Sequence, residues 1–158
     1  MNEPDALSRL ELKVPPAAVT LLFALAMWGV SKFIPTIELP LDTLIFQPFL
    51  VLASAAFGIS GVLAFKKAGT TVHPMTPEKS RTLVVEGVFR LTRNPMYLAL
   101  FLLLLALAFA LSNPASFVLA CLFIPYMNRF QIVPEERAME KLFGEQFGRY
   151  REEVRRWI

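Results

Sequence analysis

Residues 93–111 read RNPMYLALFLLLLALAFAL, and this stretch decides the fold. Pro95 has no amide hydrogen and restricts the residue before it, so a helix is expected to begin there. Leu98–Leu111 carries neither a charge nor a polar face, whereas a helix at the surface of a soluble domain has both an apolar and a polar side. We therefore expect this helix to lie in the hydrocarbon core of a membrane.

Three more apolar segments accompany this one in the chain. Residues 14–34 carry one charge and residues 44–65 carry none, so each has the roughly 17–25 apolar residues that cross a bilayer. Ser112-Asn113-Pro114 separates the quoted helix from a fourth segment, so the last two segments form a tight hairpin. The predicted fold class is all-α: a polytopic membrane protein with four transmembrane helices, at about 14–34, 44–65, 95–112 and 114–133, in a single domain spanning 1–158.

Residues 134–157 are expected to form a C-terminal amphipathic helix on the membrane surface. Pro134 suits the first helical position, and Glu135 and Glu136 complement the positive end of the helix dipole. Apolar side chains then recur at steps of three and four residues, at Met139, Leu142, Phe143, Phe147, Tyr150, Val154 and Trp157. Gly144 lowers the helix propensity, so we predict a bend there.

The distribution of charge gives the orientation in the membrane. Lys and Arg gather in the N-terminal tail, in the 66–95 link and beyond residue 128, whereas the first short loop holds Glu38 and Asp42. With four spans, all basic regions fall on one face, and the positive-inside rule makes that face cytoplasmic. We expect an integral protein of the inner or plasma membrane with both termini in the cytoplasm. The net charge of +3 then reflects attraction to anionic lipid head groups rather than nucleic-acid binding.

Histidine and cysteine are scarce in this chain. His73 is the only histidine and Cys121 the only cysteine, so the sequence predicts no metal site and no histidine-based triad. His73 precedes Pro74 in the 66–95 segment, where closely spaced prolines exclude a continuous helix. It is either a loop histidine bonded to the backbone or a ligand for a cofactor.

Two polar motifs lie at the ends of the predicted hairpin. Arg93–Tyr97 opens its first helix and Glu135-Glu136 follows its second, so both fall on the cytoplasmic side. Asn94 can cap the helix through its side-chain oxygen, and the two acids can complement the helix dipole or bind a cationic or amino-bearing ligand. Arg129 can pair with these acids or bind an anionic group of a substrate. Their convergence predicts a polar pocket at the membrane surface.

Together these motifs resemble a known group, the integral-membrane methyltransferases that include isoprenylcysteine carboxyl methyltransferases and phospholipid N-methyltransferases. The similarity runs from about Gly69 to Trp157. It rests on the segments Gly87–Arg90, Arg93–Tyr97, Asn113-Pro114, Glu135-Glu136, Phe143–Tyr150 and Val154–Trp157. The Asn-Pro-Met-Tyr string is more similar to the phospholipid branch, and the tail is more similar to the isoprenylcysteine branch.

The resemblance implies an enzyme that uses S-adenosylmethionine at the cytoplasmic membrane face. Its catalytic candidates are Arg129 and Glu135. The implied cofactor contacts are Asn94, Pro95, Met96, Tyr97, Leu102, Glu135 and Glu136, with His73 as a further candidate. Counting back from Phe143-Gly144, the substrate-binding arginine of the isoprenylcysteine branch lands at Gln131, with Arg129 close by.

The expected reaction is methyl transfer to a lipophilic or amphiphilic acceptor, with that acceptor and the lipid bilayer as partners. A sulfonium methyl group needs in-line positioning more than acid–base groups, which fits the scarcity of His and Cys. The acceptor is left open as a lipid amine, a lipid carboxylate, a thiol or a small hydrophobic molecule. Three alternatives also stay open: a four-span transporter, a non-catalytic membrane scaffold and a nicotinamide-dependent reductase. A transporter needs an ionisable residue within a span, and none lies at mid-depth.

Overall fold

The computed structural model describes residues 10–40, 45–69, 80 and 82–158. Every regular element within these ranges is helical, which confirms the all-α class. Prolines open α1, α3 and α4 in their first turn, where a helix has no use for an amide donor. The elements are α1 (Pro16–Val30), α2 (Phe46–Lys67), the 3₁₀ turn η4 (Gly87–Arg90), α3 (Pro95–Leu111), α4 (Pro114–Met127), the π-helical turn η5 (Asn128–Ile132), α5 (Val133–Phe143) and α6 (Glu145–Glu153).

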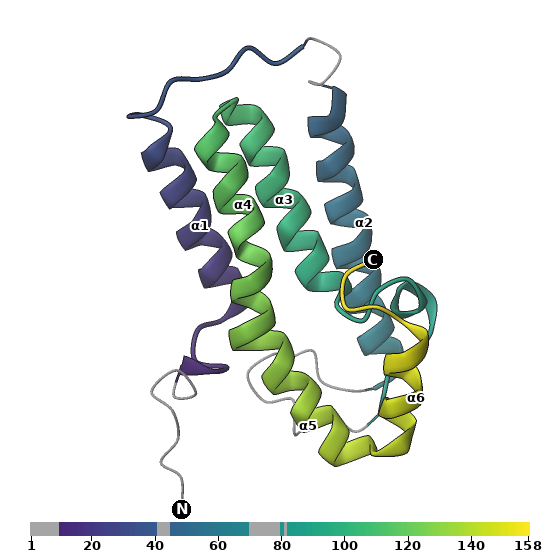
Figure 1. Cartoon of the computed structure of the whole chain (residues 1–158). Coiled ribbons are helices and arrows are strands. Elements are labelled where there is room, and N and C mark those ends of the chain that lie inside the picture. The colour runs from purple at the N-terminus through teal and green to yellow at the C-terminus, as the bar shows by residue number, and fades with distance from the viewer. Residues whose placement is uncertain (1–9, 41–44, 70–79, 81) are drawn as a thin grey trace, which may run out of the picture.

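The four apolar helices α1 to α4 lie side by side as a bundle, and α5 and α6 extend from one of its ends (Figure 1). α2 packs along α3, while α1 packs on both α3 and α4. α1 and α3 begin at the end of the bundle that carries α5, and α2 and α4 end there. The two ends of the α3–α4 hairpin therefore lie on the same side of the molecule.

In the described part of the chain, two helices are long and apolar enough to cross a membrane. They are Phe46–Lys67, with 22 residues, and the continuous helix Pro114–Phe143, with 30 residues. α1 and α3 are apolar but shorter, with 15 and 17 residues. The first predicted span, 14–34, is shortened because the helix ends at Val30 and is capped by Ser31. Two of the four predicted spans thus lie in helices of 22 and 30 residues, whereas α3 is at the lower limit of the spanning length with 17 residues and α1 falls below it with 15.

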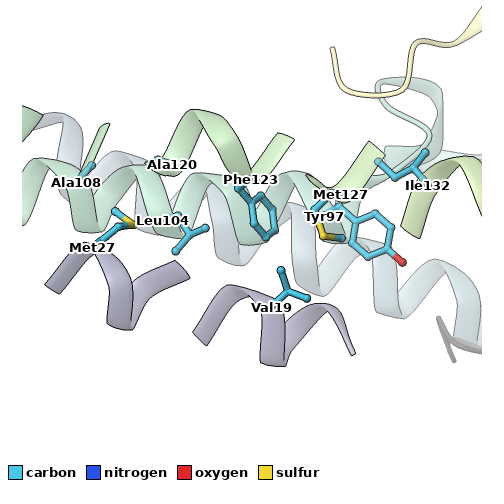
Figure 2. Close-up of a cluster of buried hydrophobic side chains, with 9 residues drawn as sticks. All are labelled: Val19, Met27, Tyr97, Leu104, Ala108, Ala120, Phe123, Met127 and Ile132. Atoms are coloured by element: carbon cyan, nitrogen blue, oxygen red, sulfur yellow. The ribbon is translucent and has the colours of Figure 1, made fainter. Parts of the chain in front are cut away.

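The core of the bundle lies between α1, α3 and α4. Its buried side chains are Val19, Met27, Tyr97, Leu104, Ala108, Ala120, Phe123, Met127 and Ile132 (Figure 2). The outward faces of α1 and α2, by contrast, expose large apolar side chains such as Trp28, Phe49 and Leu52. Extended apolar surface of this kind is typical of contact with a membrane or with another protein.

The predicted helix boundary at Pro134 is wrong, because α4, η5 and α5 form one continuous helix. Pro134 cannot donate a hydrogen bond to the carbonyl four residues earlier, at Phe130. The π-helical turn η5 widens the helix at this point, and the Phe130 oxygen accepts from the Leu12 amide at 3.0 Å instead. The single amphipathic helix expected over 134–157 is two helices, and the bend predicted at Gly144 is confirmed, with a φ of +49°.

The close contact between α2 and α3 limits the size of the side chain that can replace the hydrogen of Gly61. A Cβ atom there would lie 3.1 Å from Met96 Cγ and 3.3 Å from Pro95 Cγ. We expect Gly61→Leu to lower the free energy of unfolding by about 1–3 kcal/mol, the usual cost of overpacking. Gly29→Leu is the matched control, because nothing lies within 4 Å of a Cβ atom at that position. Thermal unfolding in detergent micelles measures both, and equal melting temperatures for the two variants would contradict this packing.

Candidate functional site

A pocket opens where the first turn of α3 meets α5, α6 and the 82–89 segment. The described residues enclose about 130 Å³, less than the roughly 300–1,000 Å³ of a typical small-molecule pocket. A nucleoside-sized ligand therefore requires the pocket to widen, and the wall at Thr82–Val84 lies outside any helix. The polar wall includes Arg93, Asn94, Tyr97, Glu135 and Glu136, and the apolar wall includes Phe65, Phe89, Met139 and Phe147.

Tyr97 and Glu135 make the contact that joins the two sides of this pocket. Tyr97 lies in the first turn of α3, at one end of the buried cluster in Figure 2, where its hydroxyl points away from the other side chains. That hydroxyl donates a hydrogen bond to Oε1 of Glu135 on α5. The Tyr97 ring is buried, whereas Glu135 keeps partial exposure toward the pocket. The pair therefore connects the two ends of the α3–α4 hairpin.

Glu136, the next residue, is held by two arginines. Arg93 Nη2 donates to its Oε1 at 2.7 Å, and Arg156 donates to it from Nε at 2.9 Å and from Nη2 at 2.6 Å. The Arg93 and Glu136 side chains are only 9% and 12% exposed. Charge-assisted hydrogen bonds with little solvent are strong and directional. Glu136 is therefore a neutralised carboxylate, whereas the partner of Glu135 is a neutral hydroxyl.

The two neighbouring carboxyl groups have opposite pKa shifts. Both lie beyond the apolar part of their helix, because Glu135 is 21 residues after Pro114, a rise of about 32 Å, whereas a hydrocarbon core is about 30 Å thick. Burial raises the pKa of Glu135 to about 8, although the Tyr97 hydrogen bond lowers it in part and the charge of Glu136 adds to the rise. Burial also acts to raise the pKa of Glu136, but hydrogen bonds and charges from Arg156 and Arg93 outweigh it and lower the pKa.

A carboxyl group that lacks a cationic partner can bind a cation. Within the described ranges, Arg93 is the only cationic side chain that lines the pocket. Its Nη1 and Nη2 are bonded to backbone carbonyls and to Glu136, and its buried Nε has no hydrogen-bond partner among these residues. A ligand with an ammonium or sulfonium group would favour the ionised form of Glu135 and displace its proton. The pocket is thus suited to a cationic ligand rather than to an anionic one.

The structure brings most of the predicted site residues together. The pocket is lined by Asn94, Pro95, Met96, Tyr97, Glu135 and Glu136. Asn94 does not cap α3 as predicted, and its Nδ2 instead donates to the Arg156 carbonyl oxygen at 2.9 Å. Leu102 lies farther along α3 and is not part of the pocket wall. His73 lies outside the described residues.

Arg129 lies away from the pocket. Its guanidinium pairs with Glu11, from the segment that precedes α1. Gln131, in the same turn η5, is buried, and its Nε2 donates to the Val14 carbonyl oxygen at 2.7 Å. These contacts tie the segment before α1 to η5. The structure thus gives Arg129 an anchoring contact and no place in the pocket wall.

Sequence reasoning did not assign Arg93 and Arg156 to the site. Arg156 stands in a run of basic residues with Arg151 and Arg155, and no local pattern distinguishes the one that folds back onto the pocket. One signal was present, because two adjacent acids beside apolar helices need a cationic partner to offset their desolvation. That signal indicates that a partner exists and leaves its position in the chain undetermined.

Comparison with known proteins identifies one family. The sequence profile of the phospholipid methyltransferase family matches residues 43–146, which include the Arg93–Tyr97 motif and both acids. A protein of Haemophilus influenzae, described as an uncharacterized protein, is 43% identical over 63 residues, which cover 40% of this chain and 100% of that protein. No solved structure matches the chain.

The raised pKa of Glu135 predicts a pH-dependent stability. A carboxyl group whose pKa rises from 4.5 to about 8 on folding stabilises the fold fully below pH 4.5, and this contribution is lost as the pH rises through about 8. Glu135→Gln cannot ionise, so the melting temperature of the wild type should fall relative to that of the variant between about pH 5 and 9. Glu140→Gln, at an exposed position of α5, is the control. Parallel curves for the wild type and Glu135→Gln would rule out this assignment.

Proposed function

Because the chain belongs to the phospholipid methyltransferase family, we propose that it transfers a methyl group from S-adenosylmethionine to a lipophilic or amphiphilic acceptor at the cytoplasmic face of a membrane. The observation that carries the proposal is the Tyr97–Glu135 hydrogen bond, which unites the Asn94–Tyr97 motif and the paired acids in one pocket. Membership of a methyltransferase family indicates the class of reaction, and the pocket supports an assignment of residues to it.

The pocket fits S-adenosylmethionine by charge. This cofactor carries two cationic groups, a sulfonium and an amino group, together with one carboxylate and an adenine ring, so its net charge is positive. Among the described residues Glu135 is the pocket carboxyl without a cationic partner, so we assign it to the amino group of the cofactor. Phe65 and Phe89 supply aromatic faces, which attract cations. Glu136 is already paired with two arginines, and we assign it a supporting role instead.

The task of the protein in this reaction is positioning, because the sulfonium supplies a methyl group that is already activated. Holding two reactants in line and in contact can provide roughly 7–11 kcal/mol of the barrier. Tyr97 orients the Glu135 carboxyl group, and Glu135 in turn holds the amino group of the cofactor. Inward closure of the Thr82–Val84 wall would exclude water from the reacting atoms.

A second, apolar pocket supports a lipophilic acceptor. It lies along α3 between α1 and α2, has a volume of about 540 Å³, and has mainly apolar walls that include Ala17, Leu103 and Ala110. Leu100, which lines this groove, is one helical turn from Met96 in the polar pocket. We propose that the hydrocarbon part of the acceptor occupies this groove from the side of the membrane, with its reacting atom at the polar pocket.

We further propose that all four apolar helices cross the membrane. α1 and α3 are short, so the bilayer must thin around them or their flanking residues must extend the span. The polar pocket and both ends of the chain would then lie on the side where the basic residues gather, which is the cytoplasmic side. This arrangement corresponds to an integral protein of the inner or plasma membrane.

Cofactor affinity tests the role of Glu135. We expect the wild type in lipid nanodiscs to bind S-adenosylhomocysteine in titration calorimetry and to release a proton near pH 7. Glu135→Gln should lose about tenfold to a hundredfold in affinity, because a hydrogen bond to a charged group is worth about 1.5–3 kcal/mol. It should also lose the proton release, which is seen as a heat that varies with the buffer. Equal affinities for Glu135→Gln and the control Glu140→Gln would remove Glu135 from the site.

Methyl transfer itself is tested with the purified protein, S-adenosylmethionine labelled in its methyl group and a membrane lipid extract. We expect label to enter the organic phase, and the identity of the labelled product names the acceptor. Glu135→Gln should lower the initial rate at least in proportion to its loss of cofactor affinity. Cofactor binding without any labelled lipid product would contradict the proposed reaction and favour a non-catalytic scaffold.

A further inference from the structure

The segment after α6 turns back onto the beginning of α3, and its residues 154–157 are called the strap (Figure 1). Backbone carbonyls of the strap accept hydrogen bonds from the three residues that precede Pro95. The donor–acceptor pairs are Arg93 N to the Arg155 oxygen (2.9 Å), Arg93 Nη1 to the Val154 oxygen (2.5 Å), and Thr92 Oγ1 and Asn94 Nδ2 to the Arg156 oxygen (2.9 Å each). The strap therefore clamps the chain at the start of α3.

Side chains of the strap extend this clamp to the continuous fourth helix. Arg156 bonds both carboxylate oxygens of Glu136 on α5. Trp157 Nε1 donates to Asn128 Oδ1 at 3.0 Å, and the Trp157 ring lies edge-on to Phe101 of α3, with centroids 6.3 Å apart. One short segment thus contacts α3, η5 and α5 together.

The residues that the strap holds are only a few positions along the chain from the Tyr97–Glu135 pair in the pocket. Tyr97 lies about one helical turn after Arg93. Glu135 is adjacent to Glu136, which is held by Arg156 of the strap and by Arg93, itself bound to the strap. A shift of the strap would therefore move Tyr97 relative to Glu135 and change the contact between them.

We propose that Arg93 and Arg156 are positioning residues for the Tyr97–Glu135 pair, and that the strap sets how strongly Glu135 binds a cationic ligand. This inference deepens the proposed function, on which its ligand-binding test rests. Arg93 and Arg156 do not bond Glu135 themselves and act on it through Glu136.

The electrostatic part of this proposal follows from the groups around Glu135. Glu135 faces the Tyr97 hydroxyl from α3 and the Glu136 carboxylate from its own helix. The charge of Glu136 opposes ionisation of Glu135, and Arg93 and Arg156 offset that charge. Loss of Arg156 leaves more of the Glu136 charge uncompensated, so Glu135 becomes harder to ionise and binds a cation less well.

The test compares Arg156→Gln with Arg155→Gln in nanodiscs. The Arg155 side chain is exposed, and only its backbone oxygen takes part in the clamp, so its substitution leaves the clamp intact. Both variants are titrated with S-adenosylhomocysteine from pH 6 to pH 9. We expect Arg156→Gln to bind about tenfold more weakly at pH 7, with the pH midpoint of binding raised by on the order of one unit, because one pKa unit corresponds to a tenfold change. Arg155→Gln should match the wild type.

Arg156→Lys separates charge from geometry, because it keeps the charge and loses the two-point contact with Glu136. Arg156→Lys should bind S-adenosylhomocysteine with the pH midpoint of the wild type but with only part of the wild-type affinity. A general loss of stability would lower the affinity without moving the midpoint. Equal affinities and equal pH midpoints in Arg156→Gln and Arg155→Gln would overturn the role of the strap and leave the proposed function standing.

Hydrogen–deuterium exchange distinguishes this failure from failure of the proposed function. If the wild type binds no S-adenosylhomocysteine, the proposed function is wrong, and exchange alone then decides the role of the strap. Faster exchange of the 93–98 and 133–137 amides in Arg156→Gln than in Arg155→Gln supports the proposal, and equal exchange overturns it. Should Arg156→Gln fail to fold, Arg156→Lys tests the geometric part of the proposal, because it loses the two-point contact with Glu136. Faster exchange of these amides in Arg156→Lys than in Arg155→Gln then supports the proposal, and equal exchange overturns it.

Discussion

The hydrogen bond between Tyr97 and Glu135 is the contact on which the rest of the site depends. It forms at the open ends of the α3–α4 hairpin, and the turn at the far end of the bundle sets how those ends meet. Asn113 fixes that turn, because its side-chain oxygen accepts from the Ala115 and Ser116 amides at 3.1 and 3.2 Å. Two antiparallel helices joined by so short a turn must bring their other ends to the same side. A turn held by the buried Asn113 at one end of the bundle thus brings the two sides of the pocket together at the other end.

Glu135 and Glu136 show how partners give two identical neighbours different chemistry. Glu136 is bound by two guanidinium groups and stays ionised, so it serves as a fixed structural tie between α5, the start of α3 and the strap. Glu135 meets a tyrosine hydroxyl, and burial keeps its carboxyl group protonated near neutral pH. A protonated carboxyl that none of the described cationic side chains bonds is a site that a positively charged ligand can ionise. Glu136 therefore keeps the site rigid, and Glu135 provides a carboxyl group that loses its proton when it binds a cation.

Much of the fold was predictable from the sequence, because proline, glycine and long apolar runs act locally. Pro95 marks the start of α3 and Gly144 marks the break in the terminal helices, as predicted. The errors involve contacts between residues far apart in the chain. Asn94, predicted to cap its own helix, bonds the carbonyl of Arg156, 62 residues away. The helix continues past Pro134 because another segment satisfies the freed carbonyl. Local patterns contain no information on such partners, so the charge balance of the site could not be predicted either.

The central claim is that Tyr97 and Glu135 are in direct contact, and a double-mutant cycle tests it most directly. The free energy of unfolding is measured near pH 7 for the wild type, Tyr97→Phe, Glu135→Ala and the double variant. Direct contact predicts a coupling energy of about 0.5–3 kcal/mol, so the effects of the two substitutions should not add. Additivity to within about 0.3–0.5 kcal/mol, which is the behaviour of residues that share no contact, would contradict the account.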